Sequence, residues 1–233
     1  MAFSPDSSRI ASVSRDETVR LWEASPTTTN LDSLDSFAPQ KCIAYSPNGR
    51  SLLSGGASQI VRQFDADTGE LCSPFQVQTL HVDYLAYSPD ALQIATAGES
   101  NDVTVWSTQT GKPNFVLRGH TAVVHAVAFS SCGRWIASCG DDGTVRIWDA
   151  HSGLPRDIFT SPYHKFRSVV FSPSGREVVA ESQSGYIWTW EVETRARKPL
   201  KNTERYGMSK LVYWPDSCQD RLQPCCRESC GLG

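Results

Sequence analysis

The chain has 233 residues, of which 39% are hydrophobic and 20% charged, so it is long enough to bury a sizeable core. A formal net charge of −3, with no acidic or basic tail, argues against nonspecific binding to nucleic acid. No stretch reaches the roughly 18 apolar residues of a membrane-spanning helix, and the N-terminus lacks the apolar core of a secretory signal. We therefore expect an intracellular protein, cytoplasmic or nuclear and not secreted.

The eight cysteines do not have the spacing of a disulfide scaffold, so we expect the body of the protein to be reduced. Four lie singly in β-like segments, namely Cys42, Cys72, Cys132 and Cys139, and four crowd near the C-terminus, namely Cys218, Cys225, Cys226 and Cys230. The C-terminal group lacks the C-x2-C pairs of closed zinc sites. The scattered histidines His81, His125, His151 and His164 also lack ligand spacing. We predict no metal and no cofactor.

A period of 42 residues organises the chain, and two independent series of residues show it. An aromatic residue followed by a turn recurs at Phe3, Tyr45, Tyr87, Phe129, Phe171 and Tyr213. The second series, which has the same spacing, is Trp22, Phe64, Trp106, Trp148 and Trp190. Such a period is typical of architectures that repeat one supersecondary unit.

Within one period, short apolar and β-branched runs alternate with turn residues. In residues 121–162 the runs that predict strands are Val124–Phe129, Trp135–Ser138, Val145–Trp148 and Ile158–Phe159. No run shows an extended 3.6-residue period, so we predict no substantial helix. Each repeat is expected to form a four-stranded antiparallel sheet.

The fourth repeat carries a specific motif. Gly119-His120 is followed by Val127-Ala128-Phe129-Ser130, Asp141-Asp142-Gly143 and Ile147-Trp148-Asp149. This motif resembles a WD repeat, and the resemblance covers residues 1 to about 216. It implies an all-β fold, a WD-repeat β-propeller whose four-stranded blades surround a channel and share apolar faces. The expected blades are about 1–36, 37–78, 79–120, 121–162 and 163–204, with the start of a sixth at 205–216.

The resemblance also implies that His120, Ser138, Asp142 and Trp148 form a hydrogen-bonded structural tetrad. Asp142 would meet one ring nitrogen of His120, and the other would meet the Ser138 hydroxyl, which would accept from the Trp148 indole. A Ser-His-Asp catalytic triad is the rival interpretation. A nucleophilic serine must face a cleft with oxyanion donors, whereas an alternating strand buries Ser138. We therefore assign no catalytic residue and expect no enzyme.

The other repeats hold incomplete versions of this tetrad. Their equivalent sets are Ser12, Asp16 and Trp22, then Ser54, Ser58 and Phe64, then Thr96, Ser100 and Trp106, then Ala180, Ser184 and Trp190. The histidine position holds Ser36, Gln78 and Pro162 in the second, third and fifth repeats. We expect these blades to be less tightly braced than the fourth, and the second to be the weakest because of Phe64.

The repeat register also predicts an incomplete ring. Met1 lies just before the first turn, so most of the innermost strand of the first blade is missing. After Asp216 the next apolar pair is replaced by Asp220-Arg221, whose charges cannot be buried without partners. We expect four full repeats and two partial ones, followed by a disordered or artefactual Cys-rich tail over 217–233. The chain is then expected to be a fragment of a longer protein.

Proteins that this chain resembles usually bind partners on the loops before the innermost strands and on the turns between the second and third strands. The candidate partner-binding residues there are Arg15, Glu17, Glu99, Asn101, Asp141, Tyr163, His164, Lys165 and Arg167. Aromatic residues beside arginine and lysine are typical of interface anchors, and they would also suit a phosphate or single-stranded nucleic acid. The alternative is that Phe166 packs between blades while Lys165 and Arg167 are only solvated.

We therefore expect a non-catalytic scaffold that binds other proteins or peptides, with no membrane or nucleic-acid partner. An alternative is the sensor region of a larger signalling nucleotide-triphosphatase. No GxxxxGK[ST] phosphate loop occurs in these 233 residues, so its catalytic part would lie outside them.

Overall fold

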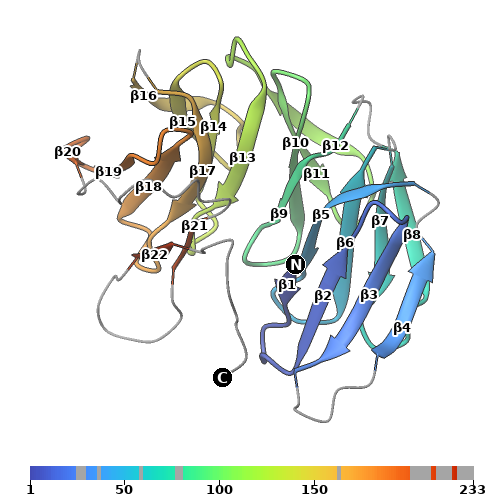
Figure 1. Ribbon diagram of the computed structural model, residues 1–233. Coiled ribbons are helices and arrows are strands. Elements are labelled where there is room, and N and C mark those ends of the chain that lie inside the picture. Colours follow the sequence, from blue (N-terminus) through green and yellow to red (C-terminus); the bar gives the residue numbers. More distant parts are fainter. Residues whose placement is uncertain are drawn as a thin grey trace, which may run out of the picture. The chain divides into compact units, whose positions relative to one another are not determined.

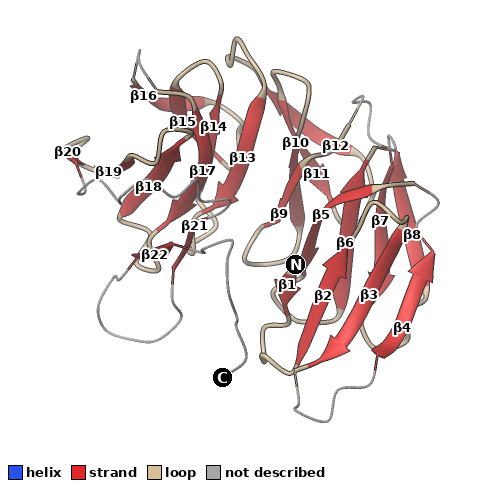
Figure 2. Ribbon diagram, viewed as in Figure 1, coloured by secondary structure: helices blue, strands red, loops and turns tan. Residues whose placement is uncertain are grey.

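The computed structural model describes residues 1–24, 30–35, 38–57, 60–76, 81–161, 164–199, 211–213 and 222–224. Every regular element in these ranges is a strand (Figure 2), and the strands form five four-stranded antiparallel sheets and one two-stranded sheet. The all-β class and the four-stranded repeat are thus confirmed. In the same ranges no helix could span a membrane. The chain divides into two compact units, Met1–Gly119 and His120–Gly233.

The first unit contains three sheets, each built from four strands that follow one another along the chain (Figure 1). Sheet 1 consists of β1 (Ala2–Phe3), β2 (Arg9–Val13), β3 (Thr18–Glu23) and β4 (Asn30–Asp35). Sheet 2 consists of β5 (Gln40–Tyr45), β6 (Ser51–Gly56), β7 (Ile60–Asp65) and β8 (Leu71–Gln76). Sheet 3 consists of β9 (Tyr84–Tyr87), β10 (Gln93–Ala97), β11 (Val103–Ser107) and β12 (Pro113–Leu117).

The second unit contains two such sheets and a short hairpin. Sheet 4 consists of β13 (Val124–Phe129), β14 (Trp135–Gly140), β15 (Thr144–Asp149) and β16 (Pro155–Thr160), which contain the four predicted runs. Sheet 5 consists of β17 (Phe166–Phe171), β18 (Glu177–Ser182), β19 (Ile187–Glu191) and β20 (Arg197–Pro199). The hairpin pairs β21 (Leu211–Tyr213) with β22 (Leu222–Pro224).

The strand β22 lies in the Cys-rich tail, where the repeat pattern predicted none. In the five complete sheets the aromatic residue pairs with a residue seven positions later, as Phe129 does with Ile136. In the hairpin Tyr213 pairs with Leu222, nine positions later. The shift of two positions gives the paired position to an apolar residue, and Asp220 and Arg221 lie outside the described residues. The four cysteines of the tail lie outside the described residues.

A serine closes the first hairpin of every four-stranded sheet in the same way. Its backbone N–H donates to the carbonyl of the residue five positions later, and its Oγ accepts from the N–H of that same residue. The Oγ···N distances are 2.9 Å for Ser4, 2.9 Å for Ser46, 2.8 Å for Ser88, 3.0 Å for Ser130 and 3.1 Å for Ser172. The buried Ser that follows each aromatic residue therefore satisfies backbone groups of a tight turn whose other residues are largely exposed.

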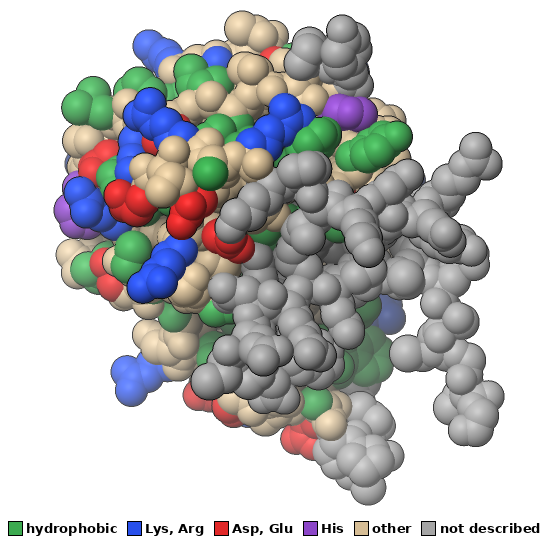
Figure 3. All heavy atoms as spheres, turned by 90° about the vertical axis from the view of Figure 1, so that its left-hand side faces the viewer, with side chains coloured by type: hydrophobic (Ala, Val, Ile, Leu, Met, Phe, Trp, Pro, Cys, Tyr) green, Lys and Arg blue, Asp and Glu red, His purple; other side chains and the backbone are tan. Residues whose placement is uncertain are grey.

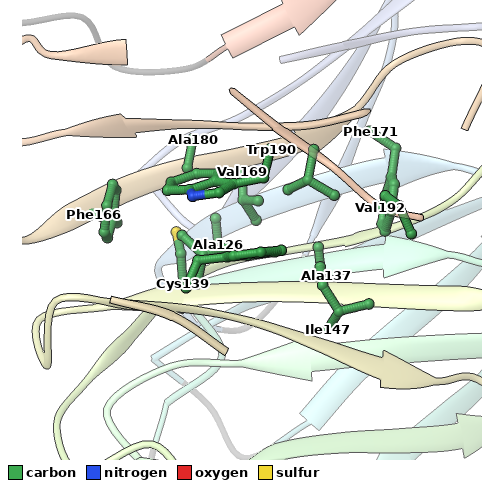
Figure 4. Packing of buried hydrophobic residues seen from close by; sticks show 13 residues of the cluster. Ala126, Ala137, Cys139, Ile147, Phe166, Val169, Phe171, Ala180, Trp190 and Val192 are labelled. Atoms are coloured by element: carbon green, nitrogen blue, oxygen red, sulfur yellow. The ribbon is translucent and has the colours of Figure 1, made fainter. Parts of the chain in front are cut away.

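Sheets 4 and 5 bury their facing sides against each other (Figure 4). Ala137 and Cys139 of β14 lie on this interface with Ala180 of β18, and all three are fully buried. The indole of Trp190 stacks on Phe159 with ring centroids 5.1 Å apart and meets the edge of Phe166 at 5.9 Å. Aromatic pairs in such geometries add to the free energy gained by burial.

The first unit is built on the same principle. One apolar cluster joins sheets 1 and 2 and includes Val19, Leu21, Leu52 and Phe64. A second cluster joins sheets 2 and 3 around Leu53, Ile94 and Trp106. Three members of the tryptophan-or-phenylalanine series, Phe64, Trp106 and Trp190, are therefore packed between neighbouring sheets.

Glu181 in β18 departs from this apolar pattern. The equivalent positions of the other sheets hold Val13, Gly55, Ala97 and Cys139, whereas the Glu181 residue is only 1% exposed. No described residue bonds its Oε2 atom. Burial raises the pKa of this carboxyl from 4.5 to about 7, because the charged form has lost its hydration.

The first prediction concerns this carboxyl. Because its pKa is higher in the folded chain than in the unfolded chain, its contribution to stability is lost as the pH rises from about 4.5 to about 7. Glu181→Gln removes the ionisation, so the variant should gain on the order of 1–3 kcal/mol over wild type at pH 8 and little at pH 5. Urea unfolding at both pH values measures the difference. The exposed control Glu193→Gln should show no such pH trend, and parallel pH profiles for Glu181→Gln and wild type would contradict the expectation.

The second prediction concerns the hairpin turns closed by the serines. Their residues Ser7, Gly49, Ala91, Gly133 and Gly175 all have positive φ, between 59° and 73°. A side chain is strained in this region and glycine is not. We expect Ala91→Gly to raise the free energy of unfolding by about 0.5–1 kcal/mol and Gly133→Ala to lower it by about 1 kcal/mol or more. Urea unfolding measures both changes, and a change of the same sign in the free energy of unfolding of the two variants would contradict this explanation.

Candidate functional site

The structure brings His120, Ser138, Asp142 and Trp148 together in one chain of hydrogen bonds. His120 Nδ1 lies 2.8 Å from Asp142 Oδ2, and His120 Nε2 lies 2.8 Å from Ser138 Oγ. The Trp148 Nε1–H donates to the same Ser138 Oγ at 2.9 Å. The chain links the segment before β13, the strand β14, the turn after β14 and the strand β15. Every polar group in it is satisfied.

The carboxylate of Asp142 determines where the protons lie. Burial alone would raise the pKa of Asp142, but hydrogen bonds from His120 and Thr144 outweigh it and hold the pKa well below its usual range. Asp142 is therefore an ionised acceptor. His120 donates a hydrogen bond to it from Nδ1–H, and its Nε2 accepts a hydrogen bond from the Ser138 hydroxyl. Thr144 was not predicted as a member, although its Oγ1 donates to Asp142 Oδ1 at 2.8 Å. The sequence feature that could have indicated this hydrogen bond is a threonine two residues after an aspartate.

The catalytic interpretation of these residues has no structural support in this geometry. Ser138 is fully buried, and its Oγ is engaged both with His120 and with Trp148. A nucleophilic serine needs access to the substrate and nearby oxyanion donors. The arrangement instead ties the loop before β13 to the β14–β15 turn, which is a stabilising role.

The other tetrads are incomplete, and the structure shows what each retains. Trp22 Nε1 donates to Ser12 Oγ at 2.9 Å in sheet 1, and Trp106 Nε1 donates to Thr96 Oγ1 at 2.9 Å in sheet 3. In sheet 2 the hydroxyl of Ser54 is buried without a partner among the described residues, since Phe64 has no N–H to donate. The positions Ser36, Ser58, Gln78 and Pro162 lie outside the described residues.

Sheet 5 has a substitute that the 42-residue register did not predict. His164 Nδ1 lies 3.0 Å from Ser184 Oγ, and Ser184 Oγ lies 3.1 Å from Ser182 Oγ. Ser184 occupies the place that Asp142 has in sheet 4, but His164 lies two positions after the place of His120. The ring of His164 also packs against Tyr186 and Trp188, with centroids 4.8 Å and 5.9 Å away.

Two candidate partner-binding pairs lie on turns of the first unit. Arg15 and Glu17 are exposed in the β2–β3 turn. Glu99 and Asn101 are exposed in the β10–β11 turn, where Glu99 Oε2 lies 3.6 Å from His81 Nε2. Both pairs lie in the turn after the second strand of their sheet, as Asp141 does in sheet 4. They do not form one cluster with each other.

In the second unit the candidates Asp141, Lys165 and Arg167 do meet. Lys165 Nζ lies 3.4 Å from Asp141 Oδ2, and Arg167 NH2 lies 3.9 Å from Asp141 Oδ1. His125 Nε2 lies 2.9 Å from Asp141 Oδ1, and Arg167 also donates to Gln183 Oε1 at 3.2 Å. Burial would raise the pKa of Asp141, but His125, Arg167 and Lys165 outweigh it and lower the pKa. We call these five residues the Asp141 cluster.

His125 was the member missed, because it was treated as one of several scattered histidines. Its signal was the register, since it lies 42 residues before Arg167 and at the same place in its repeat. Phe166 is fully buried between sheets 4 and 5, as the alternative interpretation stated. Tyr163 lies outside the described residues. Within the described part of the chain, no group of His, Cys, Asp or Glu side chains could hold a metal ion.

The third prediction compares two buried serines at equivalent positions. Ser138→Ala leaves the Trp148 indole and a ring nitrogen of His120 without partners, so it should lower the free energy of unfolding by about 2–3 kcal/mol. Ser54→Ala removes a hydroxyl that already lacks a described partner, so it should change stability by less than about 0.5 kcal/mol. Urea unfolding of the two variants checks this, and equal losses would show that the hydrogen bonds are not the cause.

Comparison with known proteins agrees with the repeat structure. The family model described as "WD domain, G-beta repeat" matches residues 1–23, 34–65 and 111–149. The three matches fall in the first, second and fourth sheets or lead into them, and the last contains the complete tetrad. A search of curated proteins found no significant match. The family match and the five four-stranded antiparallel sheets show that the chain contains WD repeats.

Proposed function

We propose that this chain is a non-catalytic scaffold that binds other proteins or peptides through the loop face of its sheets. In each sheet the loop face is the end of the strands that carries the turn between the second and third strands, namely β2–β3, β6–β7, β10–β11, β14–β15 or β18–β19. WD repeats generally mediate protein–protein interactions and are typically not catalytic. An intracellular location, cytoplasmic or nuclear, stays a prediction.

The observation that carries the proposal is the Asp141 cluster. Lys165 and Arg167 keep 57% and 37% of their side chains exposed, yet both are held by Asp141. Arginine beside aromatic residues is the composition of interface anchors, and His164 and Tyr186 lie on the same loop face of sheet 5. Cations that are positioned before binding lose less side-chain entropy on binding.

The charge distribution favours a protein partner over nucleic acid. On the face of the molecule in Figure 3, Lys and Arg side chains are interspersed with Asp and Glu side chains. A nucleic-acid surface is instead dominated by one sign of charge. A mixed surface provides the local complementarity that selects protein partners.

The fourth prediction tests this face with matched charge reversals. The double variant Lys165→Glu, Arg167→Glu should reduce the proteins that co-purify with the tagged chain by about tenfold or more. The control Arg134→Glu, Arg176→Glu changes the charge equally at the opposite ends of β13 and β17, and should leave them unchanged. Quantitative mass spectrometry of the purified complexes measures both. Equal recovery with the two double variants would contradict a role for the loop face.

A further inference from the structure

The first unit contains a cavity at the strand ends opposite to the loop face. Its volume is about 310 Å³, which falls at the lower end of the range of small-molecule sites. The β1–β2 turn, the β5–β6 turn and the start of the β7–β8 turn form its walls. The lining side chains that bear on its chemistry are Asp6, Arg9, Tyr45, Asn48, Arg50 and Asp67.

Two arginines line the cavity with hydrogen-bond donors that the protein does not use. Arg9 NH1 donates to the Ala66 carbonyl at 2.6 Å and lies 3.0 Å from Asp67 Oδ1, which fixes the side chain. No described residue accepts from Nε or NH2 of Arg9, and 32% of the side chain is exposed. The guanidinium of the exposed Arg50 also has no hydrogen-bonded or ion-paired partner among the described residues.

A third unused donor is the hydroxyl of Tyr45. This residue is 9% exposed, and its Oη is buried without a hydrogen-bond partner among the described residues. Burial raises the pKa of Tyr45, while the charge of Arg9 lowers it and that of Asp6 raises it, so both charges lie near the hydroxyl. A buried hydroxyl without a partner is destabilising unless a ligand or water supplies one.

Most of the carboxylate oxygens around the cavity are already engaged by the chain. Asp6 accepts from Ser4 Oγ at 2.6 Å, from Ser8 N at 3.1 Å and from Ser8 Oγ at 2.8 Å. These bonds, with that of Ser4 the largest effect, lower the pKa of Asp6 to about 2 and keep it ionised. Asp67 uses Oδ1 for Arg9. The unused groups are the donors of Arg9, Arg50 and Tyr45 and one carboxylate oxygen of the exposed Asp67, so a ligand that satisfies the donors must bring acceptors.

We propose that this cavity binds a small oxyanion, a carboxylate or a phosphate group, between Arg9, Arg50 and the Tyr45 hydroxyl. The planar guanidinium of Arg9 presents Nε and NH2 on one edge, which matches the two oxygens of such a group. The site is specific to the first two sheets, because the place of Arg9 is taken by Ser51, Gln93, Trp135 and Glu177 in the others. It is separate from the loop face and adds a small-molecule function to the scaffold.

The fifth prediction tests this site by calorimetric titration of the whole 233-residue chain with sodium phosphate and with sodium succinate at constant ionic strength. Saturable binding of either anion is expected, and comparing the two shows which group the site prefers. Arg9→Lys keeps the charge but removes the paired N–H donors of the guanidinium, so it should weaken anion binding about tenfold or more. Tyr45→Phe removes only an unpartnered hydroxyl, so the fold is kept while binding weakens severalfold.

Arg134→Lys is the control, because Arg134 lies in the equivalent turn of sheet 4 and is not part of the cavity. It should leave the dissociation constant unchanged within about twofold. Absence of saturable binding to both anions would overturn the proposal. So would binding that Tyr45→Phe and Arg9→Lys leave unchanged, because the anion would then be held elsewhere on the surface.

Discussion

In sheets 2 to 5 the second strand is buried on both faces, so each of these sheets needs neighbouring structure. In β14 the residues Ile136 and Ser138 point to one side and Ala137 and Cys139 to the other, and all four are fully buried. A sheet of this kind cannot be stable in water alone. Stacking therefore determines the core, while the turns at both ends of the strands are free to differ from one repeat to the next.

The two ends of the strands carry different chemistry as a result. At the loop face the turns between the second and third strands hold charged residues in sheets 1, 3 and 4, and in sheet 4 a buried network anchors this turn. At the other end the first hairpin of every four-stranded sheet is closed in the same way, by a serine that is hydrogen-bonded to the residue five positions later. The cavity of the first unit lies among those turns, where only the side chains vary. One backbone repeat thus supports two unrelated surfaces.

The sequence was sufficient to predict those features that recur with the 42-residue period. That register placed the strands of sheet 4, and with the resemblance to WD repeats it indicated the tetrad from His120 to Trp148. It could not indicate the His164–Ser184 bond, because His164 is two positions out of register. The cavity depends on how Arg9 and Tyr45 pack between two repeats, which no periodic pattern encodes. Glu181 could have been noticed, since a charge interrupts a column of small apolar residues.

The bonds to Asp142 have a consequence for the residue before it. Asp142 is fixed by hydrogen bonds from His120, Thr121 and Thr144, and Asp141 belongs to the same turn. The backbone that carries Asp141 is therefore tied to the buried network, and Asp141 in turn positions Lys165 and Arg167. Preorganisation of this kind reduces the conformational entropy lost on association. Affinity at the loop face would then depend on a buried network that no partner touches.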